Sequence, residues 1–412
     1  MGPMAIDNSA LMYLSLLRRD HANTYRFTVR LTDPVHPHVL QQAADRIFHR
    51  FPGIFAGFHP GFFSYSQVPA AAAPVVRQDD GLLRTLSKEE VRCCPYRIFH
   101  AGNEISVEIF HALTDGFGAM ATIRALLGEY LYLLHGIRSP ERTTVCAEDS
   151  ENLGEELRDA YLDHSEETPA SVPNRTACLL PNNQRNWEVK AVSRPFLTDR
   201  LLRGAKACGV SLTAFLTGIM AESIQELQFG EGKPVRIMVP IDLRKLNPSK
   251  TLRNYILYAL PTLEPEQARL PRNQRMEILH RQLREQVTAE YLFPQVARNV
   301  RLQGMLLFRM LPLPVKRLLT RVSYGIYGER NSSITLTNLG NVTFSAELRP
   351  YVREMDVLLT PRRKSPYNCA LISCGGETRI SITRFNQHPN FEERFFRKLE
   401  EALPEEPGRG ND

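Results

Sequence analysis

Residues 104–136 change from a strand pattern to a helix pattern within a few positions, and this change limits the folds open to the chain. Ile105, Val107 and Ile109 lie on one face if residues 104–110 form a strand, because successive strand side chains point to opposite faces. Asp115-Gly116 follows, and apolar residues then recur at helical spacing from position 117 to 134, with Gly136 as a stop. The segment predicts a strand, a tight turn and a helix, as in an α/β fold.

The rest of the chain repeats this mixture of patterns. Residues 25–32 alternate as a half-buried strand, residues 37–50 have helical spacing, and residues 58–68 form an aromatic-rich, strand-like segment, so the chain opens as β-α-β. In the second half, Ser211 can cap the second of three predicted helices. These helices are expected at 198–207, 212–227 and 391–403, and strands at 235–239, 334–337, 352–359, 369–374 and 379–385.

An acidic stretch separates the two halves. Between Ser139 and Pro181 carboxylates cluster, and prolines and asparagines follow them, which predicts an exposed connector with one short helix near 153–161. The carboxylates are Glu148, Asp149, Glu151, Glu155, Glu156, Asp163, Glu166 and Glu167. A chain of 412 residues can bury two cores. We therefore expect subdomains at 1–140 and 181–412, joined by residues 141–180.

Charge and cysteine content narrow the function classes and the setting. The chain has 51 Lys and Arg against 45 Asp and Glu, a net charge of +6, which suits an anionic small molecule or an acidic partner, and it has no long basic run typical of nucleic-acid binders. Seven cysteines without a Cys-x-x-Cys pair indicate reduced thiols. No convincing signal peptide and no run of about 20 apolar residues is found. These features favour the cytoplasm.

His111 and Asp115 have an ordinary interpretation and a functional one. The spacing His-x-x-x-Asp alone is common: Asp115 can cap the following helix and His111 can be a buried core histidine. The functional interpretation rests on strand parity, because one further strand position turns His111 toward the face of Ile109, where a neutral imidazole can be held in one tautomer. Gly116 suits a turn where backbone passes close by.

The residues around this motif resemble a known superfamily. Residues 96–131 include Ser-Val-Glu-Ile-Phe-His-Ala-Leu-Thr-Asp-Gly-Phe-Gly, which resembles the His-x-x-x-Asp-Gly region of CoA-dependent acyltransferases. That superfamily includes chloramphenicol acetyltransferase, condensation domains, plant BAHD enzymes and alcohol acetyltransferase-like proteins. Further resemblances follow in the same order along the chain, at 210–216, at 239–244 with Asn254 after it, and at 337–342. Together they extend from about Tyr25 to Phe385.

Three departures place the chain within this superfamily. Phe110 stands where condensation domains have a first histidine, and the Asp-Phe-Gly-Trp-Gly run of the plant enzymes is missing, since Trp187 is the only tryptophan. The motif lies in the first third of the chain, whereas chloramphenicol acetyltransferase carries it near the C-terminus. The sequence most resembles the bacterial alcohol acetyltransferase-like branch.

The resemblance implies a fold and a reaction. The fold is α/β, with two chloramphenicol-acetyltransferase-like subdomains of mixed sheets and helices forming a pseudo-dimer around a central channel. His111 is the implied general base for acyl transfer from a thioester to an alcohol or amine, without a covalent enzyme intermediate. Asp115 is the implied partner of a buried Arg244 (the plain alternative leaves Arg244 on the surface), and Gly116 is structural.

Other implied roles are less specific. Thr337, Asn338 and Gly340 are candidates for lining the channel, although a simple strand turn explains Asn338 and Gly340 equally well. Thr335 and Thr337 are guesses for stabilising an oxyanion. We expect no metal, because His21, His36, His38, His49 and His59 lack ligand spacing.

The expected partners follow from the same resemblance. We expect a monomer with no bound cofactor, using acyl-CoA or an acyl carrier thioester as co-substrate and a small-molecule acceptor. The alternatives are a condensation-type enzyme supplied by a carrier protein and a non-catalytic member of the fold. A basic, leucine-rich segment at 298–321 could contact CoA phosphates, an acidic carrier or a membrane surface, or could be a solvated helix face.

Overall fold

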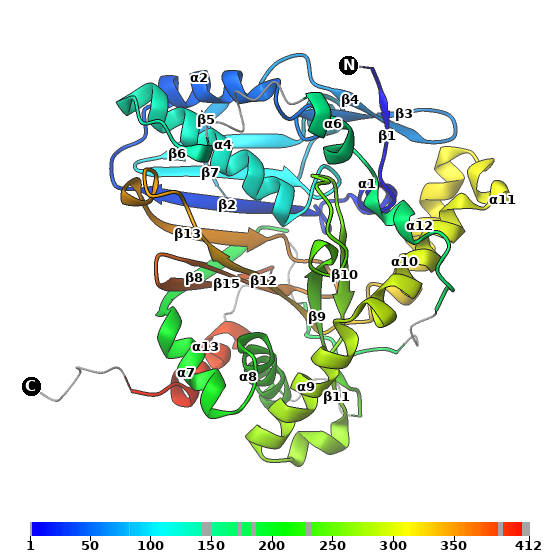
Figure 1. Ribbon diagram of the computed structural model, residues 1–412. Coiled ribbons are helices and arrows are strands. Elements are labelled where there is room, and N and C mark those ends of the chain that lie inside the picture. Colours follow the sequence, from blue (N-terminus) through cyan, green and yellow to red (C-terminus); the bar gives the residue numbers. More distant parts are fainter. Residues whose placement is uncertain are drawn as a thin grey trace, which may run out of the picture.

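The computed structural model describes residues 2–81, 83–141, 150–170, 175–182, 187–227, 232–385 and 390–405. Part of the predicted connector, including Glu148 and Asp149, lies outside these residues. Two mixed sheets dominate the structure, one in the upper half of Figure 1 and one in the lower half. The α/β class predicted from the sequence is confirmed.

The first sheet carries the strand that leads to His111. Its strand order is β13-β2-β7-β6-β5, with β5 parallel to β6 and the other pairs antiparallel. Helices α2 (Pro37–Phe48) and α4 (Gly116–His135) pack together over the apolar core of this half. The strands are β2 (Thr24–Leu31), β5 (Val76–Gln78), β6 (Tyr96–Ala101), β7 (Glu104–Phe110) and β13 (Val352–Leu359).

Strand β2 is more buried than its alternation predicted. Tyr25 and Phe27 face the core as expected, but Arg26 on the opposite face is also buried. Its guanidinium lies 3.1 Å from Glu108 on β7 and also pairs with Asp79. An ion pair allows a charged side chain to be buried. The prediction of a half-buried strand was therefore wrong at the N-terminal end of β2, where both faces are buried.

The predicted strand at 58–68 is a hairpin. Strands β3 (Ala56–Pro60) and β4 (Tyr65–Pro69) pair antiparallel, and β1 (Met4–Ala5) adds to β4 in a third sheet. The turn between them is closed by the N–H of Gly61, which donates to the carbonyl of Ser64 at 2.9 Å. Pro60-Gly61 is a strong turn signal. The prediction of a single strand followed the aromatic residues of the segment and passed over this signal.

The second sheet has the order β10-β9-β12-β14-β15-β8, and β11 also pairs with β9. Strand β12 is parallel to β9 and β14, and the other pairs are antiparallel. Ser211 caps helix α8 (Leu212–Glu226) as predicted, accepting from the N–H of Ala214 at 3.3 Å. The strands are β8 (Lys190–Leu197), β9 (Val235–Asp242), β10 (Ile256–Ala259), β11 (Thr262–Leu263), β12 (Ile334–Val342), β14 (Tyr367–Cys374) and β15 (Glu377–Arg384).

Four helices are associated with this second sheet: α7 (Thr198–Ala207), α8 (Leu212–Glu226), α9 (Arg272–Gln286) and α13 (Asn390–Ala402). Their apolar residues form a core separate from that of the first sheet. In the part of the chain that the structure describes, no single helix is long and apolar enough to cross a membrane. The pair α7 and α8, bent by 78°, meets that test only when the two helices are taken together.

Strand β13 connects the two halves. In sequence it lies between β12 and β14 of the second sheet, yet it pairs with β2 of the first, with Leu359 opposite Tyr25. It also lies against β14 and β15. The hydroxyls of Thr24 and Thr360 are 2.7 Å apart at its end. The first half is therefore completed by a strand from the second.

The remaining helices lie around this core. The helix predicted near 153–161 is divided into α6 (Ser150–Glu156) and a 3₁₀ turn (Ala160–His164), because Asp159 caps a new start by accepting from the N–H of Tyr161 at 3.1 Å. Helix α1 packs against α12. The others are α1 (Ala10–Leu16), α3 (Lys88–Cys93), α10 (Ala289–Gly304), α11 (Leu306–Arg309) and α12 (Leu313–Tyr327).

Candidate active site

Asp115 begins helix α4 and uses one carboxylate oxygen as its cap. Its Oδ1 accepts from the N–H groups of Phe117 at 3.0 Å and Gly118 at 3.4 Å. These groups have no partner within the first turn of a helix, and an aspartate at this position is among the strongest caps. The capping role considered from sequence is therefore present.

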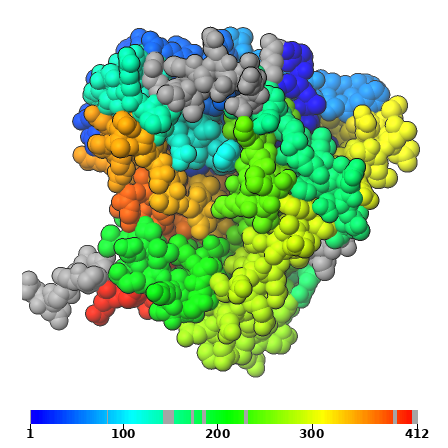
Figure 2. Space-filling view, viewed as in Figure 1, coloured from blue at the N-terminus to red at the C-terminus, as the bar shows by residue number. Residues whose placement is uncertain are grey.

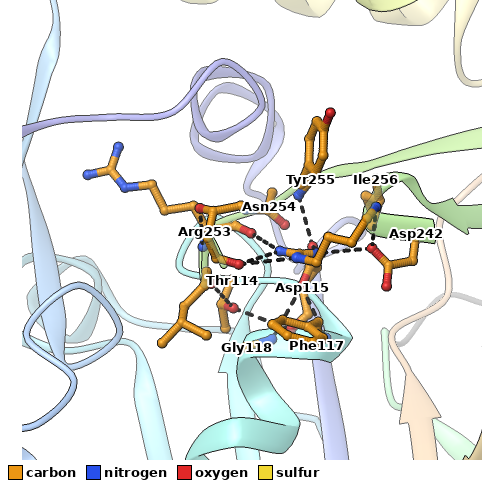
Figure 3. Close-up of polar contacts among 12 residues, drawn as sticks. Thr114, Asp115, Phe117, Gly118, Asp242, Arg253, Asn254, Tyr255 and Ile256 are labelled. Atoms are coloured by element: carbon orange, nitrogen blue, oxygen red, sulfur yellow. Dashed lines mark hydrogen bonds and ion pairs between the residues drawn. The ribbon is translucent and has the colours of Figure 1, made fainter. Parts of the chain in front are cut away.

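The other oxygen of Asp115 joins the two halves of the chain. Its Oδ2 accepts from Arg244 Nη1 at 2.8 Å and from the N–H of Tyr255 at 2.8 Å. Both charged side chains are buried. Figure 3 shows Asp115 between the start of α4 and the segment that carries Asn254 and Tyr255. Capping and ion pairing, which seemed to be alternatives, occur together because each oxygen serves one of them.

Arg244 is held on all sides. It follows β9 in a short 3₁₀ turn, and its Nε and Nη2 donate to the carbonyls of Thr251 and Arg253 at 2.7–3.1 Å. Asp242 is a second anionic partner at 2.9 Å, and the guanidinium lies 4.5 Å from the ring centre of Phe117. Burial lowers the pKa of Arg244, but the two carboxylates outweigh burial and raise it. All five N–H groups of the guanidinium are therefore bonded within the protein.

The close backbone approach expected at Gly116 occurs two residues later. A Cβ on Gly118 would lie 2.4 Å from the carbonyl oxygen of Leu252 and 2.1 Å from Thr114 Oγ1. A Cβ on Gly116 would meet only the end of the Leu339 side chain, at 2.8 Å. Gly118 therefore lets the first turn of α4 lie against the second half of the chain.

His111 follows the last residue of β7, and its backbone and ring are both held. Its N–H donates to the carbonyl of Asn23 at 2.8 Å. Asn23 has φ of +53°, a conformation that asparagine tolerates better than most residues. The half-buried ring stacks on Tyr13 with centroids 4.6 Å apart and meets the edge of Tyr25 at 5.0 Å. Two aromatic rings thus fix the plane of the imidazole.

Asn254 determines which nitrogen of His111 carries the proton. Its Nδ2 donates to the carbonyl of His111 at 2.9 Å and to Asp7 Oδ2 at 3.4 Å. A carbonyl only accepts, so this contact orients the amide and places its Oδ1 3.0 Å from His111 Nδ1. An acceptor at Nδ1 requires Nδ1–H. The neutral ring therefore keeps its lone pair on Nε2, to which no described residue is hydrogen-bonded.

The surroundings keep this imidazole uncharged. Burial lowers the pKa of His111, and the nearby carboxylates of Asp115 and Asp7 only partly offset that effect. Burial also raises the pKa of Asp7. A neutral histidine with a fixed tautomer can accept a proton from a substrate group at Nε2.

Residues 337–342 belong to strand β12, and Leu339 among them lies against the start of α4. Asn338 Nδ2 donates to Thr213 Oγ1 at 3.1 Å, and Asn338 Oδ1 accepts from the N–H of Gly340 at 2.9 Å. Gly340 has φ of +73°, in a register shift where β12 pairs with β14. Leu339 in this segment is the neighbour of Gly116. The turn expected at Asn338 and Gly340 is a register shift within a continuous strand, and their place along a channel stays a prediction.

The two threonines proposed for an oxyanion also lie on β12. Thr335 is buried, and its hydroxyl accepts from Arg362 Nη2 at 3.3 Å, whereas Thr337 is half-buried. Among the described residues, no group of three or more His, Cys, Asp or Glu side chains is arranged to hold a metal ion.

Sequence reasoning missed the residues that hold His111. Tyr13 lies in the N-terminal apolar stretch and Asp7 precedes it, and neither belongs to a recognisable motif. Asn254 was noted beside the arginine segment without a role. The one sequence signal for Asn254 is its position ten residues after Arg244. The side chains of both residues reach the region of residues 111–115 from the same part of the chain.

Comparisons with known proteins agree on the fold. No protein-family model matches the sequence, and no curated protein does either. F. graminearum TRI101, solved with coenzyme A and deoxynivalenol, has a TM-score of 0.64 at 11% identity, covering 96% of this chain and 97% of its own. Polyketide synthase associated protein 5 from Mycobacterium tuberculosis has a TM-score of 0.60 at 13% identity, with coverage of 96% and 97%.

A third solved structure extends the likeness to a condensation domain. The starter condensation domain of rhizomide synthetase, in complex with C8-CoA and Leu-SNAC, has a TM-score of 0.58 at 13% identity, covering 97% of this chain and 94% of its own. At such low identities the likeness concerns the fold. This chain therefore has the two-subdomain fold of the CoA-dependent acyltransferases, as the resemblance in its sequence implied.

Proposed function

We propose that the protein is an acyltransferase that moves an acyl group from acyl-CoA to the hydroxyl or amine of a small acceptor, with His111 as general base. The observation that carries the proposal is the bond between His111 Nδ1 and Asn254 Oδ1, at 3.0 Å. It assigns the proton to Nδ1 and leaves Nε2 as the basic atom of a neutral ring.

The proposed reaction needs no covalent enzyme intermediate. His111 Nε2 takes the proton of the acceptor O–H or N–H, and the freed oxygen or nitrogen attacks the thioester carbonyl carbon. When the tetrahedral intermediate collapses, the C–S bond breaks and the leaving thiolate takes the proton from Nε2. A positioned general base typically contributes about 10²–10⁴-fold to the rate, and alignment of the two substrates contributes further.

The proposal gives the surrounding residues structural roles. Asp115 and Arg244 hold the start of α4 against the second half, and Gly116 is the first residue of that helix. Thr337, Asn338 and Gly340 would line the channel by which substrates approach. The donor is proposed as acyl-CoA because solved structures of this fold were obtained with coenzyme A or C8-CoA.

The proposed setting is that expected from sequence. The chain would act in the cytoplasm as a monomer without a resident cofactor, and its working units would be the subdomains 1–140 and 181–412. A carrier-bound acyl thioester remains the alternative donor, and a donor panel that includes acyl-pantetheine thioesters would distinguish it.

The test is free-thiol release from a panel of acyl-CoAs with alcohol and amine acceptors. His111→Ala should lower the rate of transfer by about 10²–10⁴-fold. The matched control is His100→Ala, because His100 is equally half-buried but pairs with Ile105 near the opposite end of β7. The control should keep the wild-type rate.

The pH profile adds an independent readout. A lowered pKa means that His111 loses its base form only in more acidic solution. The rate of the wild-type protein should therefore drop only at a pH below 6.5, the ordinary pKa of histidine. Transfer by His111→Ala at nearly the wild-type rate would contradict the base assignment. A wild-type protein inactive with every thioester would contradict the proposed function itself.

A further inference from the structure

Helix α12 presents its apolar stripe to the outside of the molecule. Its exposed apolar side chains recur three and four positions apart, the spacing by which a helix normally faces a core. Between 40% and 61% of each of these side chains is exposed: Val315, Leu318, Leu319, Val322, Ile326 and Tyr327. The polar side chains of Lys316 and Arg321 instead point inward, donating to the carbonyls of Phe63 and Ser15.

Neighbouring elements extend this stripe into one patch. The end of α10 and α11 add Leu302, Met305, Leu306, Leu307 and Met310, of which Leu307 is the most exposed at 78%. The β3–β4 turn adds Phe62 and Phe63, exposed by 70% and 43%. The turn is joined to α12, since the N–H of Leu313 donates to the carbonyl of Phe62 at 2.8 Å. We call these thirteen residues the apolar face.

The apolar face projects from the body of the molecule. Figure 1 shows the β3–β4 hairpin and α11 reaching outward on the same side, beyond both sheets. In Figure 2 the yellow atoms of this region and the blue atoms of the hairpin adjoin at the edge of the molecule. Monomeric soluble proteins seldom expose contiguous apolar patches of this kind without a partner that covers them.

The chain segments that carry the apolar face contain basic residues but no acidic ones. Residues 291–328 contain no aspartate or glutamate, and the hairpin residues 56–69 contain none either. The first of these segments carries six basic residues: Lys316 and Arg321, which point inward, and Arg298, Arg301, Arg309 and Arg317. Arg18 and Arg19 are exposed just after α1, which packs against α12, and Arg18 pairs with Asp20 at 3.1 Å. Basic side chains around projecting apolar ones match an anionic lipid surface.

We propose that the apolar face docks the protein peripherally on an anionic lipid bilayer, with the apolar side chains entering the headgroup boundary and the arginines contacting lipid phosphates. A second copy of the chain fits less well, because packing two such faces together would bring cations against cations. The proposal concerns binding to a surface and stands independently of acyl transfer.

Vesicle flotation tests the proposal with the full-length protein. It should bind vesicles of phosphatidylcholine mixed with phosphatidylglycerol, bind phosphatidylcholine alone more weakly, and lose binding as salt is raised, because salt screens the arginines. The double substitution L306S/L307S should weaken binding at least about tenfold. The matched control L197S/L202S removes two leucines exposed by 53% and 47% on β8 and α7 and should bind like wild type.

A fluorescence measurement covers the case in which a substitution disturbs folding. Trp187 is the only tryptophan and is packed against Phe385, so its emission should not respond to vesicles. The variant Leu307→Trp should show a blue shift when anionic vesicles are added. Equal binding by wild type and L306S/L307S would overturn the proposal. A wild-type protein that binds no vesicle would also overturn the proposal. This holds if the protein is a monomer, and it holds equally if the protein forms a dimer that the double substitution L306S/L307S dissociates.

Discussion

Two polar clusters join the region of residues 111–118 to the region of residues 244–255, and they differ in what they leave unbonded. In the first, both oxygens of Asp115 are occupied and Arg244 is bonded on every side. In the second, Asn254 holds one ring nitrogen of His111, and no described residue bonds the other.

This difference separates support from chemistry. A saturated ion pair has no free lone pair or proton to offer a substrate, and removing one partner leaves a buried charge without compensation. A half-bonded imidazole is oriented yet still able to accept a proton. His-x-x-x-Asp thus combines a residue proposed for the reaction with one that holds the two halves together.

Breaking the saturated cluster should have the largest effect on stability. Asp115→Asn should lower the free energy of unfolding by about 3 kcal/mol, because Arg244 loses its buried anion and keeps only Asp242. Urea unfolding measures the change. Asp80→Asn is the matched control: its pair with Arg84 is solvent-exposed, and the expected change is below about 1 kcal/mol. Equal effects of the two substitutions would refute the structural role of Asp115.

Breaking the half-bonded cluster should affect the reaction more than the fold. Asn254→Ala should lower kcat roughly tenfold to a hundredfold, because the ring of His111 loses the acceptor that fixes its tautomer and orientation. Nitrogen NMR of the His111 ring should show loss of the Nδ1–H form. The control Asn247→Ala removes a nearby amide bonded to Tyr255 and should change neither quantity. An unaltered tautomer in Asn254→Ala would disprove the positioning role.

Two glycines at the start of α4 test where the second half of the chain approaches this helix. Gly118→Ala should cost about 1–3 kcal/mol in the free energy of unfolding, since its Cβ would press on the backbone carbonyl of Leu252. Gly116→Ala should be nearly neutral, because the flexible end of Leu339 can move and alanine favours a helix. Denaturant titrations measure the free energy of unfolding of both variants. If Gly116→Ala is the less stable variant, the second half of the chain approaches α4 most closely at Gly116 and not at Gly118.

Much of the fold could be predicted from local patterns. The strand-to-helix change at 104–136 and the capped helix after Ser211 depend on periodicity and on caps, which act over a few residues. Local reasoning failed at the hairpin of residues 56–69, where aromatic content outweighed a turn signal, and at Arg26, whose burial depends on Glu108.

The sequence by itself determined that this is an α/β chain, that a helix starts at Asp115, and that its residues resemble those of an acyltransferase fold. Only the tertiary structure decided that β13 completes the first sheet, that Asn254 sets the tautomer of His111, and that the stripe of α12 faces outward. The physical reason is sequence distance: Asn254 lies 143 positions from His111, and no local pattern records which distant side chains share a bond. Periodicity likewise shows that a helix has an apolar side, but not what that side meets.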